Sequence, residues 1–401
     1  MRILMLSNLY PPHFLGGYEL LCRDVTEALR QRGHELAVLT SDHGGPAEPC
    51  DYPVWRSLEL TQPLDRDPRS TIARRCALTR SNARRMREVL AAWRPDVVFA
   101  WNQNRITLGP LYEAQRCDLP VALTLNDEHM RQFTPADAED GSLRQRARRM
   151  FEELEPRLTF RGLDLRHATC ISAALQRNMA DHGFPAERLQ VIHQGIPLED
   201  FPLRSDPGSL ADPPVVLYTG GLHEDKGVSY AIEAVARVRA QGSPLRLRVV
   251  GSGSPADQAR LRELAARVCP GAVEFVGRVP REDMSAIYRA ADLFVFPSVW
   301  EEPFGLTHLE AMASGLPVVA TPVGGCREFL RHRNNALVVP PRDVEATADA
   351  LAQLLRDEDL RRQLIAGGRA TLERDLNLER YVDDLQALLE RAQADALAAA
   401  A

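Results

Sequence analysis

The stretch that decides the fold runs Phe294-Val-Phe-Pro-Ser-Val-Trp-Glu-Glu-Pro-Phe-Gly-Leu-Thr-His-Leu-Glu-Ala-Met-Ala-Ser-Gly315. It starts within an apolar run, residues 293–296, which predicts a buried strand. A loop with two glutamates follows, and from residue 305 to 314 apolar residues recur at helical spacing until Gly315 ends the helix. Strand, acidic loop and helix in this order predict an α/β unit. Ligands of such sheets bind beside the carboxyl ends of the strands.

Two carboxylates flank the start of this predicted helix. Glu302 lies just before the helix, and Glu310 lies on its second turn. The free N–H groups at a helix start favour an anion. We therefore expect a phosphate at Gly305, Leu306 and Thr307, with a sugar at one carboxylate and ribose hydroxyls at the other. The alternative is an ordinary buried helix with two incidental carboxylates.

The segment from Glu302 to Gly315 resembles the Glu-x7-Glu signature of the family 4 retaining glycosyltransferases. The spacing, the Phe-Gly pair and the Glu-Ala-Met-Ala-x-Gly tail occur together. The resemblance implies an α/β chain with the GT-B fold, in which two Rossmann-like domains face a central cleft and a C-terminal helix crosses back to the N-terminal domain. It further implies that Glu302 and residues 304–307, beginning with Phe304, bind the donor sugar and diphosphate, and that Glu310 binds the ribose.

Bulk composition narrows the class of protein. The chain has 401 residues, which suggests more than one domain, and a net charge of −6 with a pI near 6.0 gives no electrostatic case for nucleic acid binding. Its seven cysteines are scattered without a CxxC pair, which favours reduced thiols in a cytoplasm over a zinc site or disulfide framework. The apolar run at the N-terminus is too short for a signal peptide, and no stretch is apolar enough to cross a bilayer.

Lys226 is the only lysine among 49 basic residues. It lies in the glycine-containing loop 220–227, after a predicted strand at 215–219 and before a predicted helix near Val228. A cation at a helix start is unfavourable unless an anion is bound there, so the loop predicts a diphosphate site. Chance placement in a solvated loop is the alternative. The resemblance to family 4 implies that Lys226 is the family's phosphate-binding lysine. Gly221 stands where the family has an arginine that also binds the phosphate.

The N-terminal half predicts a second set of sites. A strand at residues 2–7 leads through Gly16 and Gly17 to a helix, and the resemblance implies that this Gly-Gly loop faces the donor diphosphate; a simple turn is the alternative. Further buried strands at 97–100 and 121–125 end in polar residues. Asn126 and Asp127 follow the second of these, where the family has His-Asp, so Asn126 can bond a sugar hydroxyl but cannot transfer a proton as histidine can. His129 either substitutes for that histidine or is a surface loop residue.

The predicted organisation is an N-terminal acceptor domain at 1–200, a proline-rich linker at 201–214, a nucleotide-sugar domain at 215–378 and a C-terminal helix at 379–401 whose alanine-rich end frays. Loops at Gly251 and Gly253 allow close backbone approach, and the resemblance places the nucleotide base against Arg278 and Val279. An arginine-rich helix at 69–93 presents either a solvated face or a peripheral contact with the inner membrane surface.

Taken together, these patterns predict a retaining glycosyltransferase that uses a nucleoside diphosphate sugar, with UDP or GDP expected, and a hydroxyl acceptor that is a saccharide, a lipid-linked molecule or a small natural product. The predicted catalytic residues are Lys226, Glu302, Asn126 and Asp127. No acidic pair at DxD spacing lies in a comparable loop, so metal-independent chemistry is expected. The alternatives are a non-catalytic nucleotide-sugar-binding scaffold and a GT-B-fold sugar-nucleotide epimerase. The donor-binding set comprises Gly16, Gly17, Gly220, Gly221, Lys226, Gly251, Gly253, Arg278, Val279, Glu302, Phe304, Gly305, Leu306, Thr307 and Glu310.

Overall fold

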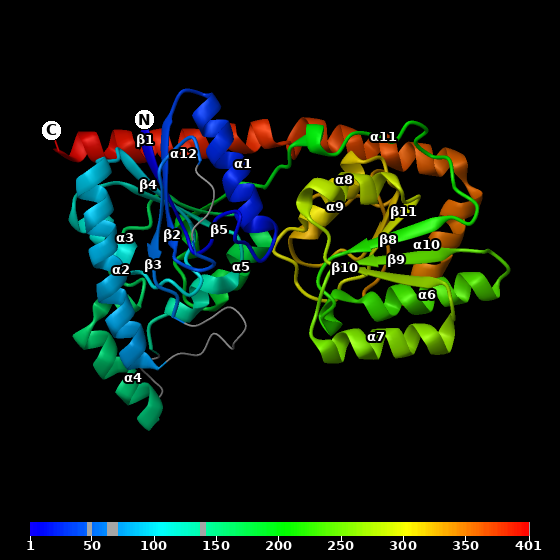
Figure 1. Ribbon diagram of the computed structural model, residues 1–401, viewed down its shortest axis with the longest axis horizontal. Helices are drawn as coiled ribbons and strands as arrows, with labels where there is room; N and C mark the ends of the chain where they lie inside the picture. The colour runs from blue at the N-terminus through cyan, green and yellow to red at the C-terminus, as the bar shows by residue number, and fades with distance from the viewer. Residues whose placement is uncertain (46–49, 62–70, 137–141, 401) are drawn as a thin grey trace. The chain divides into compact units, whose positions relative to one another are not determined.

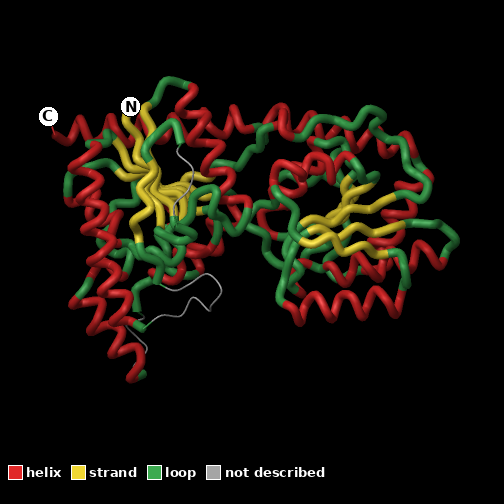
Figure 2. The backbone as a smooth tube through the Cα atoms, in the orientation of Figure 1, coloured by secondary structure: helices red, strands yellow, loops and turns green. Residues whose placement is uncertain are grey.

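The computed structural model describes residues 1–45, 50–61, 71–136 and 142–400, and the chain divides into two compact units. Residues 1–193 and 381–401 form the first unit, and residues 194–380 form the second. Each unit contains one parallel sheet with helices on both sides (Figures 1 and 2). This confirms the predicted α/β class with two Rossmann-like units.

The first unit is built on a seven-stranded sheet in the order β3-β2-β1-β4-β5-β6-β7. Its strands are β1 (Arg2–Ser7), β2 (Glu35–Ser41), β3 (Val54–Leu58), β4 (Val97–Asn102), β5 (Val121–Leu125), β6 (Ala168–Cys170) and β7 (Leu189–Val191). Its helices are α1 (Gly17–Gln31), α2 (Ile72–Trp93), α3 (Gly109–Arg116), α4 (Leu143–Leu154) and α5 (Ala173–Asp181). The central strands are buried along nearly their whole length, as expected for a parallel sheet covered on both faces.

The second unit is built on a six-stranded sheet in the order β10-β9-β8-β11-β12-β13. Its strands are β8 (Val215–Thr219), β9 (Arg246–Val250), β10 (Val273–Gly277), β11 (Leu293–Phe296), β12 (Val318–Ala320) and β13 (Leu337–Val338). Its helices are α6 (Val228–Ala240), α7 (Pro255–Val268), α8 (Arg281–Arg289), α9 (Leu306–Ala313), α10 (Val344–Arg356) and α11 (Glu358–Asp375). Helices α6 and α7 lie on one face of the sheet, and α8 and α9 lie on the other (Figure 1).

Side-chain caps fix where several helices begin. The side chains of Ser172, Ser254, Asp343 and Asp357 each accept a hydrogen bond from a backbone N–H in the first turn of α5, α7, α10 and α11 respectively. Such caps satisfy N–H groups that have no carbonyl partner within the helix. Three of these helices, α5, α7 and α10, each follow a strand, so their caps fix where the loop after that strand ends.

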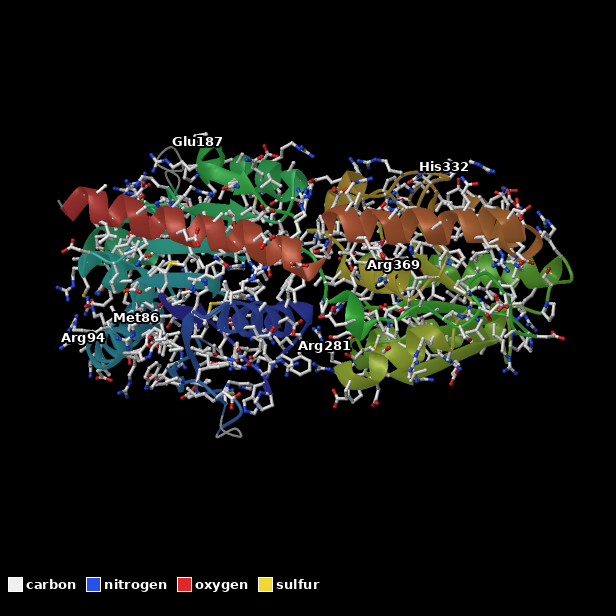
Figure 3. The ribbon with its side chains drawn as sticks, turned by 90° about the horizontal axis from the view of Figure 1, so that it is seen from above. Met86, Arg94, Glu187, Arg281, His332 and Arg369 are labelled. Atoms are coloured by element: carbon white, nitrogen blue, oxygen red, sulfur yellow. The ribbon has the colours of Figure 1, made fainter. Side chains whose placement is uncertain are left out.

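The last helix, α12 (Leu378–Ala400), is seen from above in Figure 3, and its residues from Tyr381 onward belong to the first unit. The Tyr381 ring packs edge-on against Trp101 at 6.4 Å between ring centroids, and Asp383 pairs with Arg32 at 2.7 Å. The alanine-rich end, predicted to fray, is instead helical through Ala400. Alanine has the highest helix propensity of all residues, so an alanine-rich end favours this outcome.

The segment predicted as a linker, residues 201–214, belongs to the second unit. A guanidinium nitrogen of Arg204 lies 3.0 Å from a carboxylate oxygen of Asp292, the residue just before β11. The same carboxylate accepts hydrogen bonds from the backbone N–H groups of Ala211 and Val215. These contacts anchor the segment to the sheet, while its role as the boundary between domains stays a prediction.

Candidate functional site

The predicted site residues of the second unit meet where its strand order reverses. Strands β8 and β11 are neighbours, β9 and β10 continue on one side, and β12 and β13 continue on the other. The loop after β8 carries Lys226, and the loop after β11 carries Glu302. Because both strands are parallel, these loops leave the same edge of the sheet. Such a reversal is where ligands of open α/β sheets bind.

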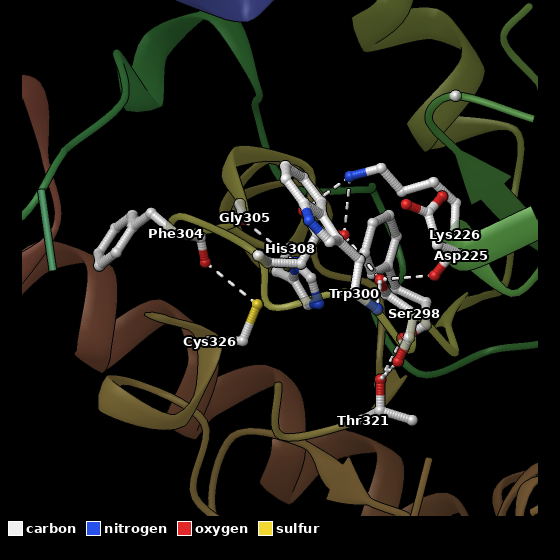
Figure 4. A network of polar contacts seen from close by, with 12 residues as sticks. Asp225, Lys226, Ser298, Trp300, Phe304, Gly305, His308, Thr321 and Cys326 are labelled. Carbon is white, nitrogen blue, oxygen red and sulfur yellow. Dashed lines mark hydrogen bonds and ion pairs between the residues drawn. The ribbon is translucent and has the colours of Figure 1, made fainter. Parts of the chain in front are cut away.

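Lys226 and Glu302 form a direct ion pair. Lys226 Nζ lies 2.8 Å from each of the two carboxylate oxygens of Glu302. It also lies 3.9 Å from the centre of the Trp300 ring, a cation–π contact (Figure 4). The side chains of Lys226 and Glu302 are 17% and 6% exposed, so both charges are largely shielded from water. The anion beside the sole lysine in this structure is therefore the carboxylate of Glu302.

The two loops are joined through their backbones as well. Asp225 O accepts hydrogen bonds from the N–H groups of Val299 and Trp300, at 2.8 and 3.2 Å. Gly227 follows Lys226 with a φ of +75°, and a Cβ there would lie 1.9 Å from the carbonyl oxygen of Pro297. Only glycine fits such a close approach in this backbone conformation. The lysine loop and the glutamate loop therefore form one rigid structure.

Glu302 is held by further contacts that the sequence did not reveal. Ser298 Oγ lies 2.7 Å from Glu302 Oε1, and Thr321 donates from its hydroxyl to the Ser298 carbonyl (Figure 4). The Gly325 N–H donates to the Glu302 carbonyl at 2.7 Å. Gly324 has a φ of +53°, and a Cβ there would lie 2.1 Å from the same carbonyl oxygen. The position of Glu302 is thus fixed through both its backbone and its side chain.

The neighbouring Glu301 has a different role. Its side chain is 62% exposed, and its Oε2 accepts a hydrogen bond from the Gly324 N–H at 2.7 Å. It therefore holds the start of the 3-10 turn Gly324–Glu328. Of the two glutamates, Glu302 is the one whose carboxylate contacts Lys226.

Glu310 lies on the second turn of α9 and is oriented by a buried tyrosine. The Tyr288 hydroxyl donates to Glu310 Oε2 at 2.6 Å and lies 2.9 Å from Thr219 Oγ1 at the end of β8. Burial, together with the nearby Glu310 carboxylate, raises the pKa of Tyr288 well above its usual value, so the phenol stays protonated. The sequence gave no signal for Tyr288, because its position on α8 fits an ordinary core residue.

The predicted glycines of this unit follow β8 and β9. Gly251 has a φ of +140°, and a Cβ there would lie 1.8 Å from the carbonyl oxygen of Gly220. A Cβ at Gly253 would lie 2.8 Å from the Cβ of Leu222. These two glycines let the loops after β8 and β9 pack against each other. Gly221 has room for a side chain, since a Cβ there would meet only side-chain atoms, the ring of His223 at 3.2 Å and Cγ of Lys226 at 4.0 Å.

Arg278 and Val279 continue this edge of the sheet. They directly follow β10, whose last residue, Gly277, accepts a backbone hydrogen bond from the Gly251 N–H at 2.8 Å. Arg278 is exposed, and Val279 is partly buried. The structure therefore brings all predicted residues of the second unit to the carboxyl edge of the strands β8 to β11.

In the first unit, Asn126 and Asp127 follow β5 but differ in what they contact. Asn126 is fully buried, and its amide donates to the carbonyl of Trp101 at 3.0 Å. The Asp127 carboxylate accepts from the His129 N–H at 2.7 Å and contacts Nδ1 of the same ring. Burial acts to raise the pKa of Asp127, but the contacts of its carboxylate with His129 outweigh this effect, so the pKa is lowered. Asp127 is therefore a weak base.

The surface-loop interpretation of His129 is wrong. Only 9% of His129 is exposed, and its Nε2 accepts a hydrogen bond from the Gln103 N–H at the end of β4. The reason is the 3-10 turn Glu128–Phe133, which Asp127 caps and which folds the imidazole back onto the sheet. Sequence periodicity does not reveal so short a turn.

The loop after β1 ends at Gly16, and Gly17 is the first residue of α1. Gly16 precedes the helix, and its N–H donates to Glu19 Oε2 at 3.1 Å. Glu19 is only 4% exposed, and burial raises its pKa. Sequence reasoning missed Glu19; its signal was a glutamate three residues after a helix-starting glycine, as in a capping box. Across the part of the chain that the structure describes, no group of three or more His, Cys, Asp or Glu side chains is placed to hold a metal ion.

Comparison with known proteins gives two family-model matches and relatives that span nearly the whole chain. The family model described as Glycosyltransferase Family 4 matches residues 15–200, and the model described as Glycosyl transferases group 1 matches residues 201–371. The glycogen synthase of Mycobacterium tuberculosis is 29% identical to this chain, and the match covers 94% of this chain and 91% of that protein.

Solved structures share the same fold. Sucrose-phosphate synthase from Thermosynechococcus elongatus superposes with a TM-score of 0.72 at 24% identity, covering 98% of this chain and 99% of the other. HepE from Anabaena, in its complex with UDP-glucose, superposes with a TM-score of 0.72 at 21% identity, covering 98% of this chain and 100% of the other. The two parallel-sheet units, the family models and these relatives all agree. The chain therefore belongs to glycosyltransferase family 4, has the GT-B fold and is an enzyme of the glycosyltransferase class.

Proposed function

We propose that this enzyme is a retaining glycosyltransferase that moves a sugar from a nucleoside diphosphate sugar to a hydroxyl acceptor. The observation that carries the proposal is the Lys226–Glu302 pair beside the start of α9, at the point where the strand order reverses. A shielded ammonium and the N–H groups of a helix start are the groups that stabilise negative charge developing on a leaving diphosphate.

The proposal gives each residue of the second unit a role in donor binding. Lys226 and the amides of residues 305–307 neutralise the diphosphate, and Glu302 accepts hydrogen bonds from sugar hydroxyls. Glu310 accepts hydrogen bonds from the ribose, with one oxygen held by Tyr288. The loops at Gly220 and Gly251 allow the donor close approach to the backbone, and the segment at Arg278 meets the base.

In the first unit, Gly16 and Gly17 are proposed to face the donor diphosphate, and Asn126 and Asp127 to position the transferred sugar or the acceptor. Asn126 has no basic group, and the pKa of Asp127 is lowered, so neither is suited to removing the acceptor proton. We therefore assign that proton to the leaving phosphate oxygen. In this step the bond from the anomeric carbon to the phosphate oxygen breaks, the acceptor oxygen bonds that carbon on the same face, and the phosphate takes the proton.

UDP-sugars are the first donors to test. Structural neighbours were crystallised with UDP and with UDP-glucose, although their identity of about one fifth supports only a choice of probe. GDP-sugars remain the second candidate. We propose that the chemistry is metal-independent, because a lysine and helix amides offer the positive charge at the diphosphate. The acceptor is a saccharide, a lipid-linked molecule or a small natural product.

The test is to incubate the purified enzyme with UDP- and GDP-sugars, an acceptor panel and a chelator. Mass spectrometry detects a glycosylated acceptor, and the anomeric proton coupling in the NMR spectrum gives the configuration of the new bond. We expect transfer with the anomeric configuration of the donor in the product. An inverted product would overturn retention, loss of activity with chelator would overturn metal independence, and an epimerised donor without transfer would support the epimerase alternative.

A cytoplasmic location with peripheral contact to the inner membrane surface is part of the proposal. Among the described residues, no helix is both long enough and apolar enough to span a bilayer. Support for the contact comes from α4, which exposes Leu143, Met150 and Leu154 at 83%, 52% and 68%. These residues recur at helical spacing, with the exposed Arg146 among them. Vesicles containing anionic lipid should sediment the enzyme, and a Leu143→Glu/Leu154→Glu variant should remain in the supernatant; equal sedimentation of the variant would overturn the contact.

A further inference from the structure

Two fully buried side chains hold the loop before α9 from its inner side. The Cys326 thiol donates to the carbonyl of Phe304, with Sγ 3.1 Å from the oxygen. His308 Nδ1 lies 3.1 Å from the carbonyl oxygen of Gly305. A carbonyl only accepts, so Nδ1 must carry the proton and donate. Figure 4 shows both side chains directed at these consecutive carbonyls.

These two hydrogen bonds, together with one from the His308 backbone N–H to the Gly305 carbonyl at 3.1 Å, hold the direction of the next N–H groups. A trans peptide unit is planar, and its N–H points opposite to its C=O. When the carbonyls of Phe304 and Gly305 point inward, the N–H groups of Gly305 and Leu306 point outward. Leu306 is the first residue of α9, where N–H groups have no carbonyl partner within the helix. Cys326 and His308 therefore aim the amides that would meet an anion.

The surroundings keep the His308 ring in one orientation. Its centroid lies 4.5 Å from that of Phe296 and 5.8 Å from that of Phe329, with the rings edge to face. Burial lowers the pKa of His308 to about 4, so the ring is neutral at physiological pH and donates from a single nitrogen.

Gly305 lies between the two side chains. It has a φ of +108°, and a Cβ there would lie 2.8 Å from His308 Nδ1 and 2.9 Å from Cys326 Sγ. The loop has little freedom to turn its carbonyls outward, because both sides of this residue are occupied.

We propose that Cys326 and His308 are positioning residues for the donor diphosphate, which act through the Phe304–Gly305 and Gly305–Leu306 peptide units. The inference rests on the proposed function, since it requires the diphosphate to bind the outward N–H groups. It adds to that function two residues that touch no substrate.

The test compares pairs of variants that keep or remove each donor. Cys326→Ala removes the hydrogen bond to Phe304, whereas Cys326→Ser keeps a hydroxyl donor of similar size. His308→Leu removes the side-chain hydrogen bond to the Gly305 carbonyl and leaves the backbone one, whereas His308→Asn keeps an amide donor near the Nδ1 position. Cys269→Ala is the matched control, because Cys269 is a buried cysteine of the same unit that follows α7, and its thiol contacts the Ile232 carbonyl of α6 rather than this loop.

Calorimetry with UDP, GDP and their parent nucleosides gives the readout. Cys326→Ala should weaken binding of the preferred diphosphate by about threefold to tenfold, the range of one lost hydrogen bond. Cys326→Ser should restore the wild-type value, and the affinity for the nucleoside alone should stay constant in every variant. His308→Leu should weaken binding less than Cys326→Ala does, because the backbone N–H of residue 308 still holds the Gly305 carbonyl, and His308→Asn should restore the wild-type value. Cys269→Ala should match the wild type.

The outcomes separate this inference from the proposed function. Equal diphosphate affinity in Cys326→Ala and the wild type, or equal losses in the Ala and Ser variants, would overturn the inference while the enzyme still binds donor. A parallel loss of nucleoside affinity would reduce both residues to packing roles and would also overturn it. A wild-type enzyme that binds neither UDP nor GDP and transfers no sugar would overturn the proposed function, and the inference with it.

Discussion

Removing the Lys226 charge should destabilise the second unit, because Glu302 would be left as a buried carboxylate. In Lys226→Met the Glu302 side chain, 6% exposed, keeps Ser298 as a hydrogen-bond partner but loses its counter-ion. Breaking a buried pair by removing one partner costs about 3–5 kcal/mol, and we expect about 3 kcal/mol because Lys226 retains 17% exposure. Glu302→Gln should cost less, since an amide oxygen still accepts from the ammonium.

The coupling between the two side chains is the sharper measurement. In a double-mutant cycle, Lys226→Met/Glu302→Gln should be about 2 kcal/mol more stable than the sum of the single variants predicts. Urea unfolding is followed by tryptophan fluorescence in a background where Trp55, Trp93 and Trp101 of the first unit are replaced by phenylalanine. The signal then reports the second unit, because Trp300 is the only tryptophan of residues 194–380. If the stability losses of the two single variants simply add up to the loss in the double variant, the two side chains are not coupled and the reasoning is refuted.

An exposed ion pair of the same unit supplies the control. Arg237 and Glu345 lie 2.7 Å apart with 48% and 68% of their side chains exposed, so Arg237→Met should change stability by less than about 1 kcal/mol. A Lys226→Met variant as mild as this control would also refute the argument. Turnover should fall by about 10²–10³ in Lys226→Met if the ammonium stabilises the leaving group. The Arg237→Met variant should retain wild-type turnover.

Three further predictions concern this unit. Gly221→Arg should tighten UDP binding by about tenfold or more, because a guanidinium there would add a charge-assisted contact; an unchanged calorimetric dissociation constant would show that this position does not face the diphosphate. Gly324→Ala should lower the urea midpoint by much more than Gly242→Ala, since both have positive φ but only Gly324 would place a Cβ 2.1 Å from the Glu302 carbonyl; equal shifts would contradict this. The pKa of His308 is lowered from 6.5 to about 4, so the neutral ring contributes fully to the stability of the fold above pH 6.5. As the pH falls towards 4, the free energy of unfolding should decrease by up to about 3 kcal/mol. Urea midpoints that fall equally with pH in the wild type and in His308→Asn would disprove this prediction.

Local patterns in the sequence predicted the elements of the site but not their pairing. The strand at β11, the helix α9 and the glutamate between them follow from an apolar run, a glycine and helical spacing. The contact between Lys226 and Glu302 depends on β8 and β11 being neighbours, which is a property of strand order. No pattern within either segment specifies that order. The ion pair therefore could not be read from the residues alone.

The supporting residues escaped prediction for a related reason. Ser298, Tyr288 and Cys326 are common residue types at positions that fit a core or a loop, and their roles depend on partners at least four positions away. His308 had a detectable signal, because it is an ionisable residue inside the predicted helix at 305–314, whose other inward positions are apolar. Buried polar groups that interrupt an apolar pattern need a hydrogen-bond partner. For His308 that partner is the carbonyl of Gly305, three residues earlier.

The ion pair explains why a lysine is useful at position 226 in a chain that otherwise relies on arginine. An ammonium is a compact charge with rotatable donors, whereas a guanidinium binds a carboxylate through two fixed parallel hydrogen bonds. Lys226 can therefore turn from Glu302 to a diphosphate without breaking a planar two-point contact. When Lys226 turns, Glu302 loses its counter-ion, and its buried carboxylate then needs other hydrogen-bond partners. The hydroxyl groups of the nucleotide sugar can supply them. On the proposed mechanism, diphosphate binding and sugar binding favour each other: the phosphate releases the carboxylate, and the sugar hydroxyls satisfy it.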